Sequence, residues 1–178
     1  MSVLLVGLGN PGSEYEKTRH NVGFRVLEFF AGEHGSAVSK KGFSSFWTKL
    51  SVGSDVFVQL SQTYMNLSGE AVRALADYYR IAPKNIMLVH DELDLPLGKL
   101  KKAFGSGAAG HRGVSSVAEH LGTKDFWRLR LGIGRPERKE QVSDFVLHPF
   151  QKDEEVFVEK MIKEAVSLLN EFILEVKK

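Results

Sequence analysis

The chain has 178 residues, of which 43% are hydrophobic and 26% are charged, and this composition suits one globular domain over residues 1–178. It contains no cysteine, which excludes disulfide scaffolds, zinc ribbons, iron–sulfur clusters and cysteine nucleophiles. No apolar run reaches the length that spans a bilayer, and the N-terminus is too short and uncharged for a signal peptide, so we expect a cytoplasmic protein with no membrane partner.

Hydrophobic patterns predict strands and helices that alternate along the chain. Short apolar or alternating runs indicate strands, and apolar residues spaced three and four apart indicate helices. The expected strands are Val3–Val6, Phe46–Val52, Asp55–Leu60, Ile86–Val89, Leu97–Phe104 and Trp127–Ile133. The expected helices are Val22–Glu33, Leu67–Tyr79, Val114–Leu121 and Glu154–Val176. We therefore predict an α/β single-domain sandwich, with a mostly parallel mixed central sheet flanked by helices.

Three polar clusters follow predicted strands. They are Gly7–His20, His90–Asp94 and Gly105–Gly113. In sheets of this kind, ligands bind outside the carboxyl ends of the parallel strands. We therefore expect the three clusters to converge on one functional site.

Basic residues are concentrated in one segment. Residues 98–139 contain ten Lys or Arg and three Asp or Glu, a net charge of +7, whereas the whole chain carries only +2. Such a segment either forms a face that binds a polyanion or is an ordinary solvated surface. Charge alone leaves both interpretations open.

The loop Gly7–Gly12 matches the dinucleotide fingerprint G-x-G-x-x-G. A dinucleotide site needs a helix directly after the glycines and an acidic residue at the end of the next strand. Here Ser13–Arg19 has no apolar stripe, and the next predicted strands end in Val52 and Leu60. A dinucleotide-dependent oxidoreductase is therefore disfavoured.

The chemistry that remains is that of a histidine that activates water. The chain lacks the serine-elbow, P-loop and zinc-protease motifs. A histidine base needs a carboxylate to fix its tautomer, and Asp91 at a strand end could do this for His20. His20 also lies near a predicted helix start, which disfavours its protonated form. Other interpretations of these residues stay open. Asn10 could simply form a turn, and Asn66 could simply cap a helix. His90–Asp94 could be a hard-metal site or a capped turn, and Gly105–Gly113 could be a phosphate cradle or a plain loop.

Five motifs occur in the same order as in one known family. They are Gly7–Gly12 with Tyr15, Thr18–Gly23, Thr63–Gly69, His90–Pro96 and Arg128–Gly134. On these motifs the chain closely resembles the bacterial peptidyl-tRNA hydrolase family. The resemblance implies hydrolysis of the ester that joins a peptide to the terminal ribose of tRNA, which recycles peptidyl-tRNA released from ribosomes.

The resemblance also implies roles for single residues. His20 would be the general base, Asp91 would hold it in its basic form, and Asn10 would help to distinguish N-blocked peptidyl-tRNA from free aminoacyl-tRNA. The implied substrate contacts are Tyr15, Tyr64, Met65, Asn66, His111 and Arg112. The implied tRNA phosphate contacts are Lys101, Lys102 and Arg130. The family works as a monomer on the tRNA acceptor end, and no metal or organic cofactor is implied.

Two positions depart from the family pattern. Arg112 stands where the family usually has asparagine, and arginine cannot accept a hydrogen bond but can pair with a phosphate. Ala103 stands at one lysine of the family's phosphate clamp, flanked by Lys101 and Lys102. We expect retained activity with altered affinity.

The alternative function is that of a catalytically silent RNA-binding relative of the same fold. Arg112 favours this alternative weakly. The presence of the complete catalytic set argues against this alternative, because a protein that only binds RNA need not keep it. The set is Asn10, His20, Asn66 and Asp91.

Overall fold

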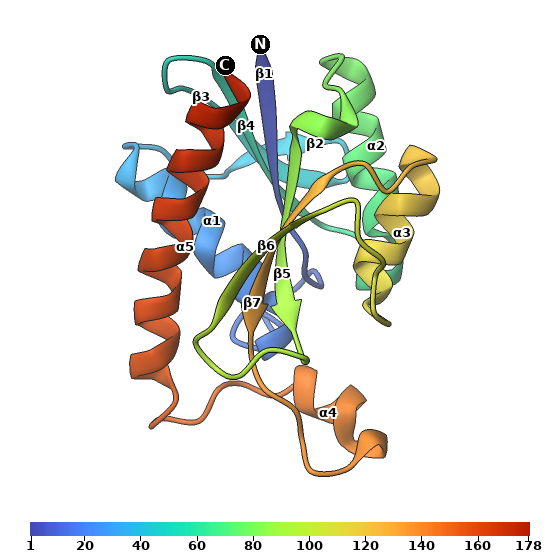
Figure 1. Ribbon diagram of the computed structural model, residues 1–178, viewed down its shortest axis with the longest axis vertical. Coiled ribbons are helices and arrows are strands. Elements are labelled where there is room, and N and C mark those ends of the chain that lie inside the picture. The colour runs from blue at the N-terminus through green and yellow to red at the C-terminus, as the bar shows by residue number, and fades with distance from the viewer.

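The computed structural model describes residues 1–178 and contains one seven-stranded mixed sheet with helices on both faces (Figure 1). The strands are β1 Ser2–Gly7, β2 Lys40–Gly42, β3 Ser45–Ser51, β4 Asp55–Ser61, β5 Ile86–Glu92, β6 Leu100–Phe104 and β7 Trp127–Gly132. The helices are α1 Val22–Glu33, α2 Ser68–Tyr78, α3 Arg112–Leu121, α4 Val142–Val146 and α5 Glu155–Val176. The predicted α/β sandwich is confirmed.

The sheet has the strand order β2-β3-β4-β1-β5-β7-β6. β4, β1, β5 and β7 run parallel, whereas β2, β3 and β6 are antiparallel to their neighbours. The parallel strands end at one common edge, the lower edge in Figure 1, beyond which α4 lies. This edge is where the fold places ligands.

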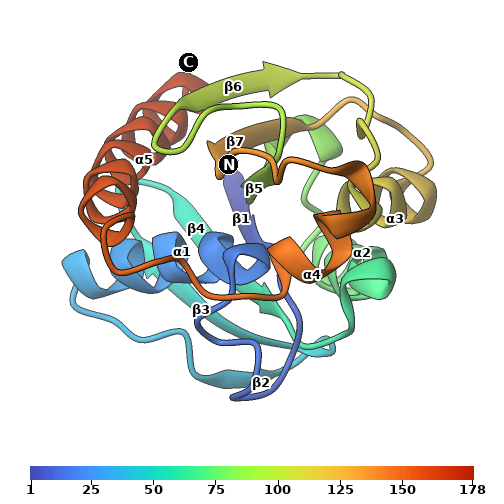
Figure 2. The same ribbon diagram turned by 90° about the horizontal axis from the view of Figure 1, so that it is seen from below.

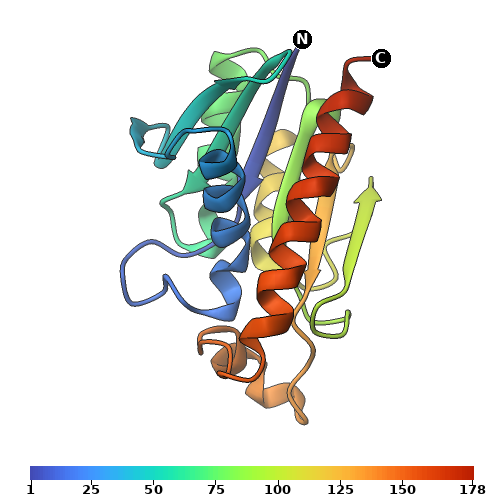
Figure 3. The same cartoon turned by 90° about the vertical axis from the view of Figure 1, so that its left-hand side faces the viewer.

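Two hydrophobic cores enclose the sheet, because side chains of a strand point alternately to its two faces. In β1, Val3 and Leu5 pack toward α1 and α5, whereas Leu4 and Val6 pack toward α2 and α3. Figure 3 shows α1 and α5 lying along their face of the sheet. The apolar run of β1 is thus explained by burial on both sides. None of the helices combines the length and apolar composition needed to cross a bilayer.

Glycines let β1, β5 and α1 approach closely. A Cβ on Gly23 would lie 2.2 Å from the carbonyl oxygen of Val89, and one on Gly9 would lie 2.9 Å from the Asn21 side chain. Helix α1 begins only at Val22, so no helix opens directly after the glycine loop. The glycines of this loop therefore allow close packing, and the loop is not followed directly by the helix that holds the pyrophosphate in a dinucleotide site.

Several boundaries differ from the sequence prediction. β5 continues to Glu92, so His90 and Asp91 lie within the strand and not after it. β6 begins at Leu100, three residues later than expected, and α3 begins at Arg112, two residues earlier. Strand β2 and helix α4 were not predicted, because three and five residues are too short to show a period.

The expected position of Gly105–Gly113 after a parallel strand is wrong. β6 is antiparallel, and its last residue, Phe104, pairs with Trp127 at the amino end of β7. The following loop returns along the sheet and reaches the carboxyl edge only at His111, which contacts Asp91. By this course the loop Gly105–Gly113 still reaches the other two polar clusters, Gly7–His20 and His90–Asp94.

Candidate active site

A cleft of about 630 Å³ opens at the carboxyl edge of the parallel strands. Viewed from that edge, α4 lies between α1 and α3 (Figure 2). Eight of the predicted site residues line the cleft: Asn10, His20, Tyr64, Met65, Asn66, Asp91, His111 and Arg112. The three polar clusters therefore converge, as expected.

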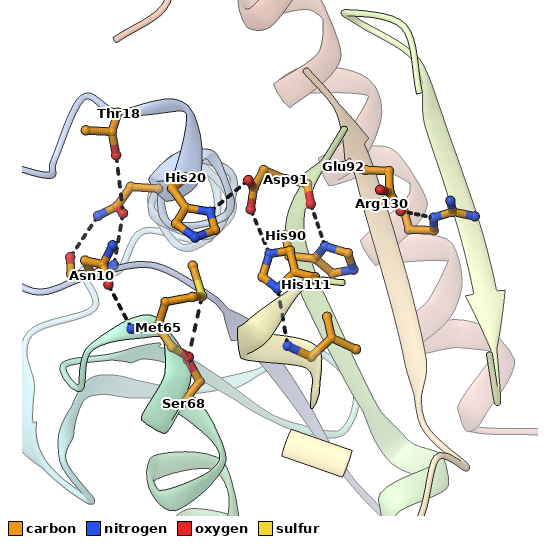
Figure 4. Close-up of polar contacts among 12 residues, drawn as sticks. Asn10, Thr18, His20, Met65, Ser68, His90, Asp91, Glu92, His111 and Arg130 are labelled. Atoms are coloured by element: carbon orange, nitrogen blue, oxygen red, sulfur yellow. Dashed lines mark hydrogen bonds and ion pairs between the residues drawn. The ribbon is translucent and has the colours of Figure 1, made fainter. Parts of the chain in front are cut away.

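His20 and Asp91 face each other in this cleft (Figure 4). A single 3₁₀ turn, Arg19–Asn21, presents His20, and the last part of β5 presents Asp91. His20 Nδ1 lies 2.8 Å from Asp91 Oδ2. Because an ionised carboxylate only accepts hydrogen bonds, Nδ1 carries the proton and donates. The lone pair therefore resides on Nε2 of His20, as a general base requires.

A second histidine shares the same carboxylate. His111 Nε2 lies 2.8 Å from Asp91 Oδ1, and His111 Nδ1 accepts the Val114 N–H at 3.3 Å. This capping bond at the start of α3 makes Nδ1 the acceptor and Nε2 the donor. Both oxygens of Asp91 are thus held by ring N–H groups, so the carboxylate cannot rotate away from His20.

His90 supports the pair of histidines. It is 1% exposed, and its ring centroid lies 4.6 Å from that of His111. Its Nδ1 donates to the main-chain oxygen of Asp91 at 2.7 Å. Burial, followed by the nearby His111, lowers the pKa of His90 well below its ordinary value. His90 is therefore a neutral packing group.

His20 and Asp91 shift each other's pKa. Burial alone would raise the pKa of Asp91, but His20 and His111 outweigh burial and hold that pKa well below its usual range. Burial alone would lower the pKa of His20, but the charge and hydrogen bond of Asp91 raise it, while Arg112 opposes part of this rise. The pKa of His20 is therefore raised, and not lowered as we expected from the predicted helix start. Asp91 is thus ionised, and His20 is neutral only above its raised pKa.

Asn10 offers an amide N–H₂ group to the cleft. Its Oδ1 accepts the Met65 N–H at 2.8 Å. Its main chain is held by the Asn21 side chain through bonds of 3.0 and 2.9 Å. Because the oxygen is already used, Nδ2 is the group left to donate to a substrate.

The other predicted substrate contacts differ in position. Tyr64 and Asn66 are exposed at the cleft and their side chains have no hydrogen-bond partner; Asn66 does not cap α2. Met65 is 5% exposed and is bound through its main chain to Asn10. Tyr15 is half-buried and lies outside the cleft lining.

The predicted phosphate contacts lie on two faces of the sheet. Lys101 and Arg130 pair directly across β6 and β7 and so share one face. On this face Arg130 Nε lies 2.6 Å from Glu92 Oε1 (Figure 4), and Glu92 lines the cleft. Lys102 points to the opposite face, where its Nζ lies 2.7 Å from Glu175 of α5. The structure therefore brings two of the three cations together.

The three groups around Asp91 also have the composition of a metal site. One ligand atom each of His20, Asp91 and His111 lies within 4.8 Å of the others. A metal on His111 Nε2 would require the proton on Nδ1, where the Val114 N–H already points. The hydrogen bonds therefore suit proton transfer better than metal binding.

Two buried arginines were not predicted to shape the site. Arg128 is 3% exposed and its Nη2 donates to Ser106 Oγ and Gly107 O, at 2.6 and 2.7 Å, which fastens the loop before α3. Arg19 is 5% exposed and contacts α4 and the start of α5. In the sequence, Arg19 stands beside His20 within the family motif Thr18–Gly23, and this position could have drawn attention to it.

Comparison with known proteins gives a consistent result. A model of the peptidyl-tRNA hydrolase family matches residues 4–178. The peptidyl-tRNA hydrolase of Exiguobacterium sibiricum is 45% identical over 170 residues, which cover 95% of this chain and 92% of that protein. The crystal structure of the peptidyl-tRNA hydrolase from Acinetobacter baumannii has a TM-score of 0.92 at 38% identity, and the match covers 97% of this chain and 89% of that one. The chain belongs to the peptidyl-tRNA hydrolase family.

Proposed function

We propose that this protein hydrolyses the ester of peptidyl-tRNA with His20 as the general base and Asp91 as its orienting partner. The observation that carries the proposal is the 2.8 Å contact from His20 Nδ1 to Asp91 Oδ2, which leaves Nε2 free in the cleft. The alternative of a silent RNA-binding relative is not favoured, because close homologues of the whole chain are named as hydrolases.

The reaction needs one proton carrier. His20 Nε2 takes a proton from water as the water oxygen attacks the ester carbonyl carbon. Asp91 stabilises the resulting imidazolium. The same proton then passes to the ribose oxygen as the ester bond breaks, so the peptide leaves as an acid and the tRNA regains its hydroxyl. Asn66 is proposed to donate to the developing oxyanion, which is supported by its exposed amide at the cleft.

Asn10 gives a physical basis for choosing N-blocked substrates. Its free Nδ2 donates a hydrogen bond, and the carbonyl of a blocked amino group accepts one. The ammonium of a free aminoacyl-tRNA is itself only a donor. Tyr64 at the rim and Arg112 at the start of α3 are proposed to contact the acceptor end of the tRNA. Tyr15 is proposed to contact the substrate from just outside the cleft.

We also propose that the protein acts as a monomer with one domain over residues 1–178, as the resemblance to the family implies. The cytoplasm is the proposed location, because ribosomes form the substrate there.

The rate of hydrolysis as a function of pH tests the base. We expect kcat/KM for N-acetyl-aminoacyl-tRNA to fall as pH drops through the pKa of His20, which Asp91 raises above its ordinary value. Arg112→Asn removes a charge that lowers this pKa, so the acidic limb should move to higher pH. Arg80→Asn is the control, because Arg80 is exposed away from the cleft with φ of 55°, which asparagine tolerates. A flat profile would contradict a histidine base.

The choice of substrate is a separate expectation. Unblocked aminoacyl-tRNA should be a poor substrate over the whole pH range.

The salt dependence of KM tests the phosphate face. Of the three cations we propose Lys101 and Arg130 as the main contacts. Lys101→Ala should raise KM at low salt and reduce the slope of log KM against log salt concentration by about 0.7–0.9, since one phosphate contact is lost. Lys102→Ala removes the same charge on the opposite face and should leave the slope unchanged. Equal effects of both substitutions would show that the face is assigned wrongly.

A further inference from the structure

Arg19 is a buried cation beside the base in sequence. It is 5% exposed and does not line the cleft. Its Nη1 donates to Phe145 O at 3.1 Å, and its Nη2 lies 3.0 Å from Glu154 Oε1. The guanidinium carbon lies 4.1 Å from the ring centroid of Phe145 and 5.6 Å from that of Phe150. One side chain thus joins the turn that carries His20 to α4 and to the start of α5.

The segment 139–148, which contains α4, is attached through Arg19. Apart from the bonds between Gln141 and the adjacent Arg138, the hydrogen bonds that join this segment to the rest of the protein start from Arg19. The side chain of Arg19 donates to Phe145 O, and its main-chain N–H donates to His148 O at 3.0 Å. A helix of five residues is not stable alone. Behind α4 lies a second hollow of about 600 Å³, so α4 stands between two open spaces.

The other side of α4 faces His20. Val142, Ser143 and Val146 line the cleft from this side. The position of this wall relative to His20 sets the width available to the ester and its peptide. We propose that Arg19 is a positioning residue that fixes the α4 wall relative to His20 and thereby controls substrate binding. This inference rests on the proposed use of the cleft for peptidyl-tRNA.

Conservative substitutions separate this role from simple stabilisation. Arg19→Lys keeps the charge but loses the planar fork, so it can reach Phe145 O or Glu154 and not both. Phe145→Leu keeps an apolar side chain and removes the ring against the guanidinium, which provides a second variant on the partner side. Arg25→Lys is the matched control, because Arg25 also pairs with the start of α5, 2.9 Å from Glu155, and makes no hydrogen bond to α4.

The expected result is a change in KM and in local dynamics. Arg19→Lys should raise KM for N-acetyl-aminoacyl-tRNA about tenfold and Phe145→Leu about threefold, with kcat per folded enzyme changed less than about twofold, because the wall moves and the base does not. Hydrogen–deuterium exchange of the amides in residues 139–148 should be faster in both variants. Arg25→Lys should leave KM and this exchange unchanged.

Three results would overturn the proposal. The first is a lower Tm with unchanged KM and unchanged exchange in 139–148, which would make Arg19 a purely structural residue. The second is an unchanged KM despite faster exchange. The third is an equal rise of KM in Arg25→Lys. Failure of this proposal can be distinguished from failure of the proposed function. Hydrogen–deuterium exchange is measured without substrate, so it does not depend on whether His20 is the base. A wrong assignment of the base would show only in the activity of His20 variants.

Discussion

Replacing His20 with alanine is expected to lower kcat for N-acetyl-aminoacyl-tRNA by about 10²–10⁴-fold, the range that a positioned general base contributes. No other ring can take over the proton. His111 Nδ1 already accepts the Val114 N–H, and its Nε2 carries the proton that it donates to Asp91. Release of the labelled acyl group under single-turnover conditions measures the chemical step directly.

The control for His20→Ala is His34→Ala. His34 follows α1 at its far end, where its Nε2 lies 3.3 Å from Asn170 Oδ1. The His34→Ala variant loses the same kind of ring at the opposite end of α1, outside the cleft, so turnover should stay near that of the unmodified protein. A His20→Ala protein that is folded, binds tRNA and keeps the rate of His34→Ala would show that another group is the base.

The second large effect is expected for Asp91→Asn, a loss of about 10³–10⁴-fold in kcat, as for the aspartate of other histidine-based sites. Asp91 accepts from two ring N–H groups, one from His20 and one from His111. An asparagine side chain offers one acceptor oxygen and one N–H₂ donor. If the N–H₂ group faces His20, then Nδ1 must become the acceptor and Nε2 takes the proton, so His20 cannot act as a base.

The pH profile of Asp91→Asn tests the orienting role independently, through the direction in which its acidic limb shifts. Asp91 raises the pKa of His20, so its neutralisation should move the acidic limb of the residual activity to lower pH. This shift is opposite to the one expected for Arg112→Asn. Asp94→Asn is the control, because Asp94 is exposed and pairs with Arg135 at 2.5 Å. Equal activity of the Asp91 and Asp94 variants would contradict the orienting role.

Much of the frame of this site could be predicted from sequence. The apolar run of β1 and the polar residues that follow it placed Asn10 and His20 at the correct edge of the sheet. The end of β5 was set too early because its last residues, among them His90 and Asp91, are polar but buried. They stay in the strand because β7 pairs with them, while hydrogen bonds hold both oxygens of Asp91 and Nδ1 of His90.

What the sequence could not show is how separate elements meet. The prediction assigned His111 to the substrate, and the structure shows its ring held between Asp91 and the start of α3. The sequence could in principle have predicted which face of the sheet Lys102 points to, because Lys102 stands two residues after the inward Leu100 in the same strand. α4 is too short to show a periodic signal, and contacts with a distant residue, Arg19, hold it in place.

The parallel arrangement also determines when the enzyme becomes competent. β1 lies between β4 and β5, and β5 pairs with β7, so each of these parallel pairs joins strands that are far apart in the sequence, and the second strand is synthesised long after the first. Contacts between distant parts of a chain form late in folding, because closing long loops costs entropy first. A nascent chain that has not yet emerged as far as Glu154 lacks the carboxylate partner of Arg19, and one that has not reached Val142 also lacks the α4 wall. Hydrolytic capacity is therefore acquired only near the completion of translation.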